Sequence, residues 1–127
     1  MLTTIVACIY LLLILFTVFF QLGLVLKMPW GEYTLGGYVK GILPLNLRIN
    51  AFISAIILTS IGYIGLEKTG LVNLWWKPPS YSIWFVVGFM FLGVILNSIT
   101  RSKKEKMLWL PVTFILFLCC LYFAFGL

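Results

Sequence analysis

The sequence predicts an all-α membrane protein of four antiparallel transmembrane helices, and three observations support this. Hydrophobic residues make up 63% of the chain and charged residues only 9%, whereas soluble domains usually carry about 25% charged residues. The charges leave four uncharged stretches, each close to the roughly 20 apolar residues that cross a bilayer as helix. These stretches are 1–26, 49–66, 78–100 and 107–127. We therefore expect 1–127 to form a single four-span domain with lipid as its main solvent.

The first helix is expected over Thr3–Leu26. No basic residue precedes its apolar run, the run is longer than the core of a signal peptide, and no small-residue cleavage site follows it. We therefore interpret this segment as a transmembrane helix of the protein.

The connection between the first two helices is long and rich in glycine and aromatic residues. Gly36-Gly37 suits a two-residue hairpin turn, because both positions can adopt positive φ without penalty. We expect a short β-hairpin in this first cytoplasmic loop, and the alternative is an irregular or re-entrant loop whose backbone is satisfied by protein or water. The hairpin would pair Leu35 with Tyr38, Thr34 with Val39, and Tyr33 with Lys40.

The second helix is expected over Leu47–Leu66 and carries a stripe of small residues. Ala51, Ala55 and Thr59 recur every four residues, and such a stripe lets a neighbouring membrane helix approach closely. We therefore expect this helix to pack through these three residues at the centre of the bundle.

The third and fourth helices have recognisable starts. Pro78-Pro79-Ser80 provides a stop followed by a cap, which predicts a third helix over Tyr81–Thr100. Ser102 and Glu105 have the spacing of a capping box, which predicts that the fourth helix covers Lys103–Phe125.

Lysine and arginine are distributed unequally between the connections. The first and third connections lie on one side if all four helices span, and they hold seven cations against two in the second connection. Cytoplasmic loops retain the excess of such residues, so we expect both termini and the second connection outside the plasma membrane. The seven are Lys27, Lys40, Arg48, Arg101, Lys103, Lys104 and Lys106, and the two are Lys68 and Lys77.

The net charge of +6 is then mostly a property of the cytoplasmic face. Anionic lipid head groups are attracted to such a face by about 1 kcal/mol per cation. The lipid bilayer is therefore the expected partner, and no nucleic acid is needed to explain the charge.

Catalytic, cofactor and metal sites are not predicted. The chain has no histidine, and its three carboxylates, Glu32, Glu67 and Glu105, lie in connections or at the ends of spans. An enzyme built on a histidine base or an acid cluster is therefore not expected. The same positions give no support to proton coupling through a carboxylate in mid-membrane.

Polar residues gather at the predicted cytoplasmic side, where lipid offers no hydrogen-bond partners and polar groups turn toward the bundle. One interpretation is that they cross-link helices and satisfy loop backbone. The other is a cytoplasm-open pocket for an anionic head group or small polar ligand, with two arginines as donors. We also expect an ion pair between Glu32 and Arg48 or Arg101. The candidate cluster is Gln21, Glu32, Arg48, Asn50, Asn97, Arg101 and Glu105.

A set of motifs spread over most of the chain resembles a group of small, uncharacterised four-span integral membrane proteins of Gram-positive bacteria. The resemblance implies the four-helix architecture and a bacterial plasma membrane, and it assigns no role to any residue. The motifs are Pro29-Trp30-Gly31, Gly36-Gly37, Leu43-Pro44 with Arg48, Asn97-Ser98, and Arg101-Ser102-Lys103-Lys104-Glu105 followed by Trp109 and Pro111.

Two classes of function fit these observations. The first is an accessory, partner-binding or protective membrane subunit, which needs only spans, a packing face and a basic inner surface. The second is a small transporter, or a membrane protein that binds a polar or anionic ligand, acting as an oligomer. Copurification of a second polypeptide favours the first class, and transport in proteoliposomes favours the second.

Overall fold

The structure is a computed structural model that describes residues 1–34 and 39–126. Each of its four long helices is long and apolar enough to cross a membrane, which confirms the predicted fold of four helices with the length and composition of membrane spans. The predicted bounds differ from the observed ones by two residues or fewer. The elements are α1 (Leu2–Val25), the 3₁₀ helix η1 (Gly31–Tyr33), α2 (Leu45–Lys68), α3 (Ser82–Ile99) and α4 (Lys103–Phe125).

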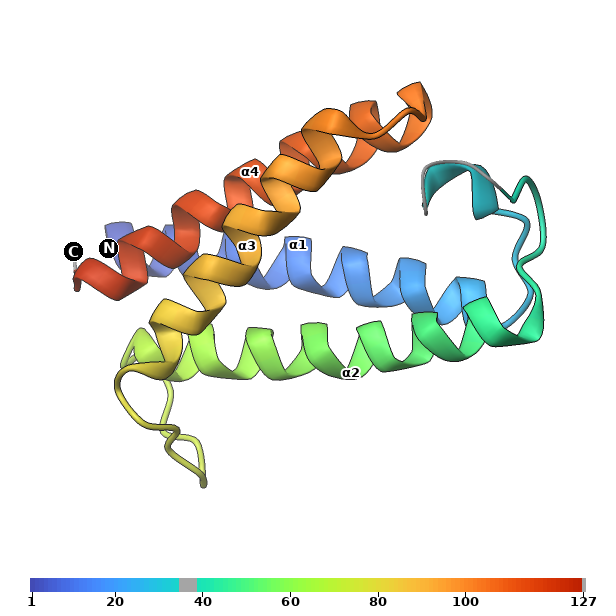
Figure 1. Cartoon of the computed structure of the whole chain (residues 1–127). Coiled ribbons are helices and arrows are strands. Elements are labelled where there is room, and N and C mark those ends of the chain that lie inside the picture. Colours follow the sequence, from blue (N-terminus) through green and yellow to red (C-terminus); the bar gives the residue numbers. More distant parts are fainter. Residues whose placement is uncertain (35–38, 127) are drawn as a thin grey trace.

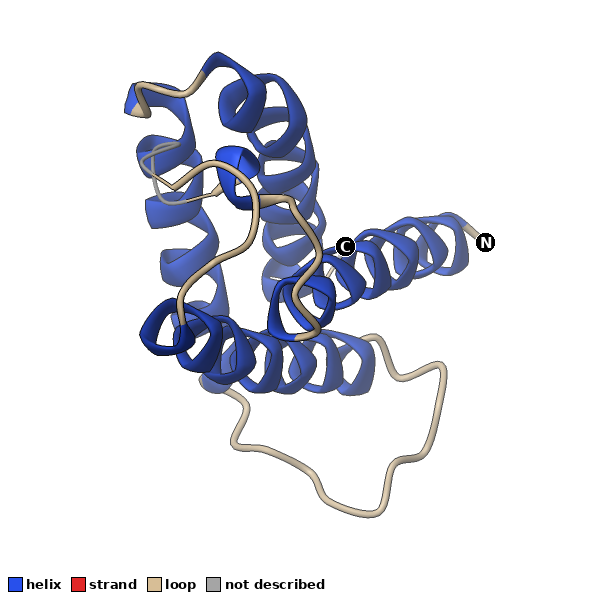
Figure 2. Ribbon diagram, turned by 90° about the vertical axis from the view of Figure 1, so that its right-hand side faces the viewer, coloured by secondary structure: helices blue, strands red, loops and turns tan. Residues whose placement is uncertain are grey.

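The helices form two antiparallel pairs. α1 packs mainly against α2, and α3 packs mainly against α4. Figure 1 shows that the pairs lie close together near the two termini and diverge toward the opposite end, where η1 sits between them. Figure 2 shows the same arrangement after a turn of 90°, with residues 26–34 and 39–44 of the connection between α1 and α2, here called loop one, lying across the divergent end.

The end near the termini, here called the closed end, has a core in which all four helices take part. Tyr10 is fully buried there, and its hydroxyl donates to the Ile61 carbonyl at 2.5 Å. Gly65 of α2 makes this possible, since a Cβ at that position would collide with the Tyr10 hydroxyl. The core residues are Ala7, Tyr10, Ile14, Ile61, Ile83, Val86, Val87, Met90, Leu116, Cys119, Cys120 and Phe123.

Residues of α2 approach α1 through small side chains. Ala51 and Ala55 are buried, whereas Thr59 is exposed and its hydroxyl donates to the Ala55 carbonyl at 2.8 Å. Toward the C-terminal end of α2, the close approach to α1 continues through Gly62 and Gly65. An added Cβ at Gly62 would lie 2.9 Å from the Ile14 side chain. Ile61 of α2 belongs to the closed-end core and Ile64 packs against it, and α2 packs mainly against α1, with smaller contacts to α3 and α4.

The divergent end, here called the open end, has a smaller core that loop one helps to fill. Its buried residues are Phe20, Leu24, Leu43, Ala51 and Trp109. The Trp30 ring stacks on Phe20 with a centroid distance of 5.7 Å. It also covers Gly23 so closely that a Cβ there would overlap the indole.

Hydrogen bonds at the start of α4 agree with the predicted cap. Ser102 Oγ accepts from the Glu105 amide at 3.2 Å, so α4 begins at Lys103 as expected. The Ser102 amide donates to the Thr100 hydroxyl at 3.4 Å. The bond that the capping box assigns to the serine is therefore present. The Ser102 amide, which a capping box would pair with the Glu105 side chain, donates to the Thr100 hydroxyl.

The β-hairpin predicted for loop one is wrong for the part that the structure describes. Its turn at Gly36-Gly37, with Leu35 and Tyr38, lies outside the described residues. Tyr33, expected in a strand, belongs to η1. The physical reason is that α4 supplies the partners that a second strand would have supplied: the Ser102 hydroxyl donates to the Glu32 carbonyl and the Trp109 indole donates to the Tyr33 carbonyl.

Candidate functional site

A cavity of about 250 Å³ with several polar side chains in a mainly apolar wall lies at the open end, between the two helix pairs. Every long helix and loop one contribute to its wall, so it is here called the central cavity. The lining residues are Thr17, Phe20, Gln21, Tyr33, Thr34, Ser54, Ile57, Leu58, Phe89, Gly93, Asn97, Glu105, Trp109 and Thr113.

The spacing of these residues explains why they meet. Glu105, Trp109 and Thr113 are four residues apart on α4 and therefore share one face of the helix. Gly93 and Asn97 have the same spacing on α3. Gly93 leaves room inside the wall, because a Cβ there would touch only the Thr113 side chain, at 3.7 Å or more.

Hydrogen bonds fix the wall that α3 and α4 form. Asn97 Nδ2 donates to the Gly93 carbonyl at 2.9 Å and lies 3.4 Å from the Thr113 hydroxyl. The Thr113 hydroxyl in turn donates to the Trp109 carbonyl at 2.8 Å. These bonds orient an amide and a hydroxyl toward one another across the two helices and satisfy polar groups that are partly buried.

Glu105 is the charged residue of the central cavity. It retains only 8% of its surface exposed and lies in the first turn of α4, where the helix dipole favours a negative charge. A carboxylate accepts through two oxygens with about four lone-pair sites. Glu105 therefore brings a multivalent acceptor to the wall of the cavity.

Loop one is fastened to α4 beside the cavity through residues 30–34, here called the strap. Trp109 Nε1 donates to the Tyr33 carbonyl at 2.9 Å, and Ser102 Oγ donates to the Glu32 carbonyl at 2.8 Å. Lys104 Nζ lies 2.8 Å from Glu32 Oε1 and 5.8 Å from the centroid of the Tyr33 ring. These contacts connect α1, through Trp30 and Phe20, to the first turns of α4.

The ion pair of Glu32 differs from the prediction, which named Arg48 or Arg101 as its partner. Lys104 takes this place because η1 rests on the first turn of α4. Arg48 is occupied elsewhere: its Nε donates to the Val25 carbonyl at 3.0 Å, at the carbonyl end of α1 where the dipole favours a cation.

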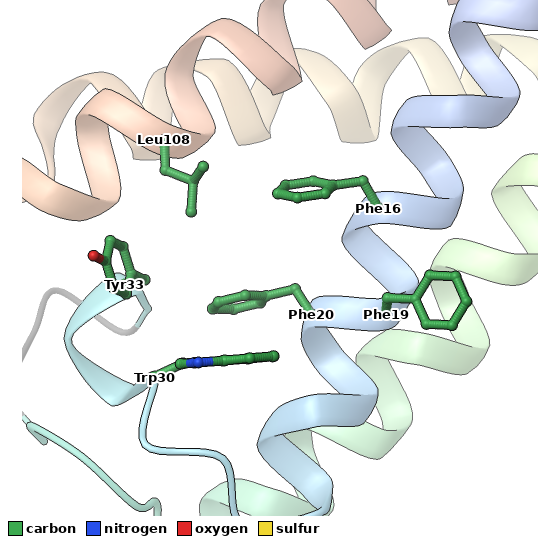
Figure 3. A pocket seen from close by; sticks show the side chains of 6 residues that line it. All are labelled: Phe16, Phe19, Phe20, Trp30, Tyr33 and Leu108. Carbon is green, nitrogen blue, oxygen red and sulfur yellow. The ribbon is translucent and has the colours of Figure 1, made fainter.

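A second cavity of about 280 Å³ lies between α1, the strap and α4, and is here called the aromatic cavity. Figure 3 shows Phe16 and Phe20 reaching from α1 toward Leu108 of α4, with Trp30 and Tyr33 on the strap side. Phe16 and Phe19 are exposed, so this cavity opens sideways toward the region that lipid occupies. Phe20 and Tyr33 line both cavities, which therefore adjoin one another.

The residues of the predicted polar cluster have separate places. Gln21, Asn97 and Glu105 line the central cavity, Glu32 belongs to the strap, and Arg48 caps α1. Asn50 and Arg101 are exposed. Neither arginine is among the lining residues that the structure describes, so the expected pair of anion donors does not face the cavity.

Sequence reasoning missed several residues of the two cavities. Trp109 is absent from the predicted polar cluster, yet its indole is buried and donates to the Tyr33 carbonyl of the strap. Ser54 and Thr113 are polar residues inside apolar spans, and their helical spacing from other polar residues was the available signal. The aromatic cavity depends on side chains that could equally have faced lipid.

Comparisons with known proteins find no family model, no curated protein and no solved structure that matches the chain. In the described part of the chain, no group of three His, Cys, Asp or Glu residues is arranged to hold a metal ion. The geometry of the open end is therefore the basis for assigning a function.

Proposed function

We propose that the protein is a multi-pass membrane protein that binds a small polar molecule, or the polar head of a lipid, in the central cavity. One observation supports this above the others: side chains of all four helices bring Gln21, Ser54, Asn97, Glu105 and Thr113 to one cavity at the open end of the bundle. Small-ligand sites are mostly apolar cavities in whose wall a few polar groups converge. The cavity volume of about 250 Å³ is near the lower end of ligand pockets, which suits a head group.

We further propose that the open end faces the cytoplasm of a bacterial cell. The seven-to-two excess of cations in the first and third connections supports this orientation. The exposed cations at the same end, including Lys103 and Lys106, are suited to anionic lipid head groups.

Cysteine labelling tests the orientation. In a variant whose native cysteines are replaced, Lys77→Cys is expected to react with an impermeant thiol reagent on intact cells. Lys103→Cys is expected to react only after permeabilisation. The reverse pattern would contradict the proposed orientation, and equal reactivity of both sites on intact cells would contradict a fixed one.

The binding function is tested by filling the cavity. Gly93→Leu places a large side chain in the wall, whereas Gly88→Leu makes the same change on the same helix where an added Cβ would meet nothing within 4 Å. Native mass spectrometry of protein released from nanodiscs of bacterial lipid extract should show a retained small molecule or lipid in the wild type and in Gly88→Leu. Gly93→Leu should lose it.

Equal retention by both glycine variants would show that the central cavity is not the binding site. A wild-type protein that emerges without any retained molecule would argue against the function itself. Circular dichroism and the midpoint of thermal unfolding of each variant distinguish loss of binding from loss of fold.

An accessory, partner-binding or protective subunit is the second candidate function. A groove of about 380 Å³ between α2 and α3, lined by residues such as Ile56, Ser60 and Phe85, supports it, since a partner helix could pack there. Affinity purification in mild detergent is the test. A second polypeptide that copurifies with the wild type and with Gly93→Leu favours this candidate, while ligand retention confined to the wild type and Gly88→Leu favours the first.

A further inference from the structure

The charge of the central cavity is opposite to the charge of the chain. Nine Lys and Arg residues against three Glu residues give the protein a net charge of +6, yet none of the nine is among the lining residues that the structure describes. Glu105 is the charged member of that wall. A cavity of this kind favours a cationic group, although the basic outer surface suggested an anionic ligand.

Aromatic rings strengthen this preference. Trp109 and Phe20 both line the central cavity with ring centroids 4.7 Å apart, and Tyr33 lies beside them. The face of an aromatic ring, that of Trp above all, attracts ammonium groups. Glu105 can accept from a ligand in addition to its contacts within the protein, because a carboxylate has several acceptor sites.

The adjoining aromatic cavity provides a place for an apolar chain. Its wall of Phe16, Phe19, Phe20, Trp30, Tyr33 and Leu108 contains no charged side chain. Phe16 and Phe19 at its edge are exposed on α1, and Phe20 and Tyr33 form the wall that it shares with the central cavity. A ligand could therefore enter sideways from the bilayer and place its polar end inward.

From these contacts we infer that the ligand is a cationic amphiphile: an ammonium head occupies the central cavity beside Glu105, and one apolar chain occupies the aromatic cavity. This inference rests on the proposed function and adds the sign of the head group, the presence of a chain and the route of entry.

The experiment compares four probes by isothermal titration calorimetry in dodecyl maltoside, with protein-free micelles as the blank. The probes are dodecyltrimethylammonium, the neutral dodecanol, the anionic dodecanoate and the chain-free tetramethylammonium. Dodecyltrimethylammonium is expected to bind most tightly. Tetramethylammonium should bind more weakly because it cannot fill the aromatic cavity, and dodecanoate should not bind.

Two variants and one control variant test where the head group and the apolar chain of the ligand bind. Glu105→Gln is expected to weaken dodecyltrimethylammonium binding by about tenfold or more, as expected when a charge-assisted contact is lost. Glu67→Gln also removes one negative charge, but at a position that lines neither cavity, and it should leave binding unchanged. Phe16→Ala should weaken dodecyltrimethylammonium about fivefold and leave tetramethylammonium unchanged.

The outcomes separate this inference from the proposed function. If dodecanol binds as tightly as dodecyltrimethylammonium, and Gly93→Leu abolishes both, the cavity binds ligands but the cationic preference is wrong. Equal weakening by Glu67→Gln and Glu105→Gln would also overturn the inference. If no probe binds and no molecule is retained from membranes, the proposed function fails together with it.

Discussion

The closed and open ends of the bundle are built from the same four helices but pack in different ways. At the closed end, twelve buried residues from all four helices form one core. At the open end, the buried cluster has five residues in the part of the chain that the structure describes, one of which, Leu43, comes from loop one, and two cavities lie beside it. The closed end is therefore the more completely packed part of the bundle, and the open end is the part that contains cavities.

Side-chain chemistry accounts for the contrast. The closed end combines small residues with large apolar ones, as where Gly65 accommodates Tyr10, and Tyr10 meets Phe123 edge-on at 5.2 Å. At the open end, Asn97 of α3 and Glu105 of α4 face the central cavity, and Tyr33 and Thr34 of the strap form another part of its wall. Apolar complementarity draws membrane helices together, while the polar faces leave a cavity.

The largest expected effect comes from truncating the closed-end core. Tyr10→Ala removes a fully buried ring and should lower the free energy of unfolding by about 3–5 kcal/mol. Phe16→Ala at the open end, where the ring is 46% exposed, should cost much less. Unfolding by sodium dodecyl sulfate in mixed micelles measures both, and equal losses would remove the distinction between the two ends.

A smaller effect is expected from the close approach of α1 and α2. Gly65→Ala would push a methyl group into the Tyr10 hydroxyl and should cost about 1–3 kcal/mol. Gly88→Ala is the matched control: an added Cβ meets nothing within 4 Å there, and better helix propensity should stabilise by up to about 1 kcal/mol. The same unfolding assay applies, and a neutral Gly65→Ala would show that the helices can separate without cost.

The smallest effect is expected from the ion pair of the strap. Lys104 is 58% exposed on its side chain in the contact with Glu32, and exposed pairs contribute little. Lys104→Gln should lower the midpoint of thermal unfolding slightly at low salt and not measurably at about 1 M salt. Lys103→Gln should change it under neither condition, and a large, salt-independent loss in Lys104→Gln would mean that the strap is a major source of stability.

The helices could be predicted from the sequence because lipid imposes a simple requirement. A span needs about 20 apolar residues with an internally bonded backbone, and local signals such as the Ser102 cap set its bounds. The predicted Lys103–Phe125 coincides with α4. These features depend on residues close together in the chain.

The strap and the cavities depend on residues far apart in the chain. Tyr33 and Trp109, and likewise Glu32 and Ser102, are separated by at least 70 positions, so no local pattern could indicate that α4 would replace a second strand. The sign of the charge in the wall of the central cavity could not be predicted from the sequence either. The sequence predicted Arg48 and Glu105 in one cluster, but Arg48 turns to the end of α1, and Glu105 faces the cavity.

Thiol labelling in lipid vesicles tests most directly whether the open end holds a polar cavity while the closed end is sealed. In a Cys8→Ser variant, Ser54→Cys should react with a small water-soluble thiol reagent, because Ser54 lines the central cavity. The native Cys119 and Cys120, buried at the closed end, should not react, nor should Ser60→Cys on the lipid-exposed part of α2. If Ser54→Cys were as unreactive as Cys120, or Cys120 as reactive as Ser54→Cys, the contrast between the two ends would be contradicted.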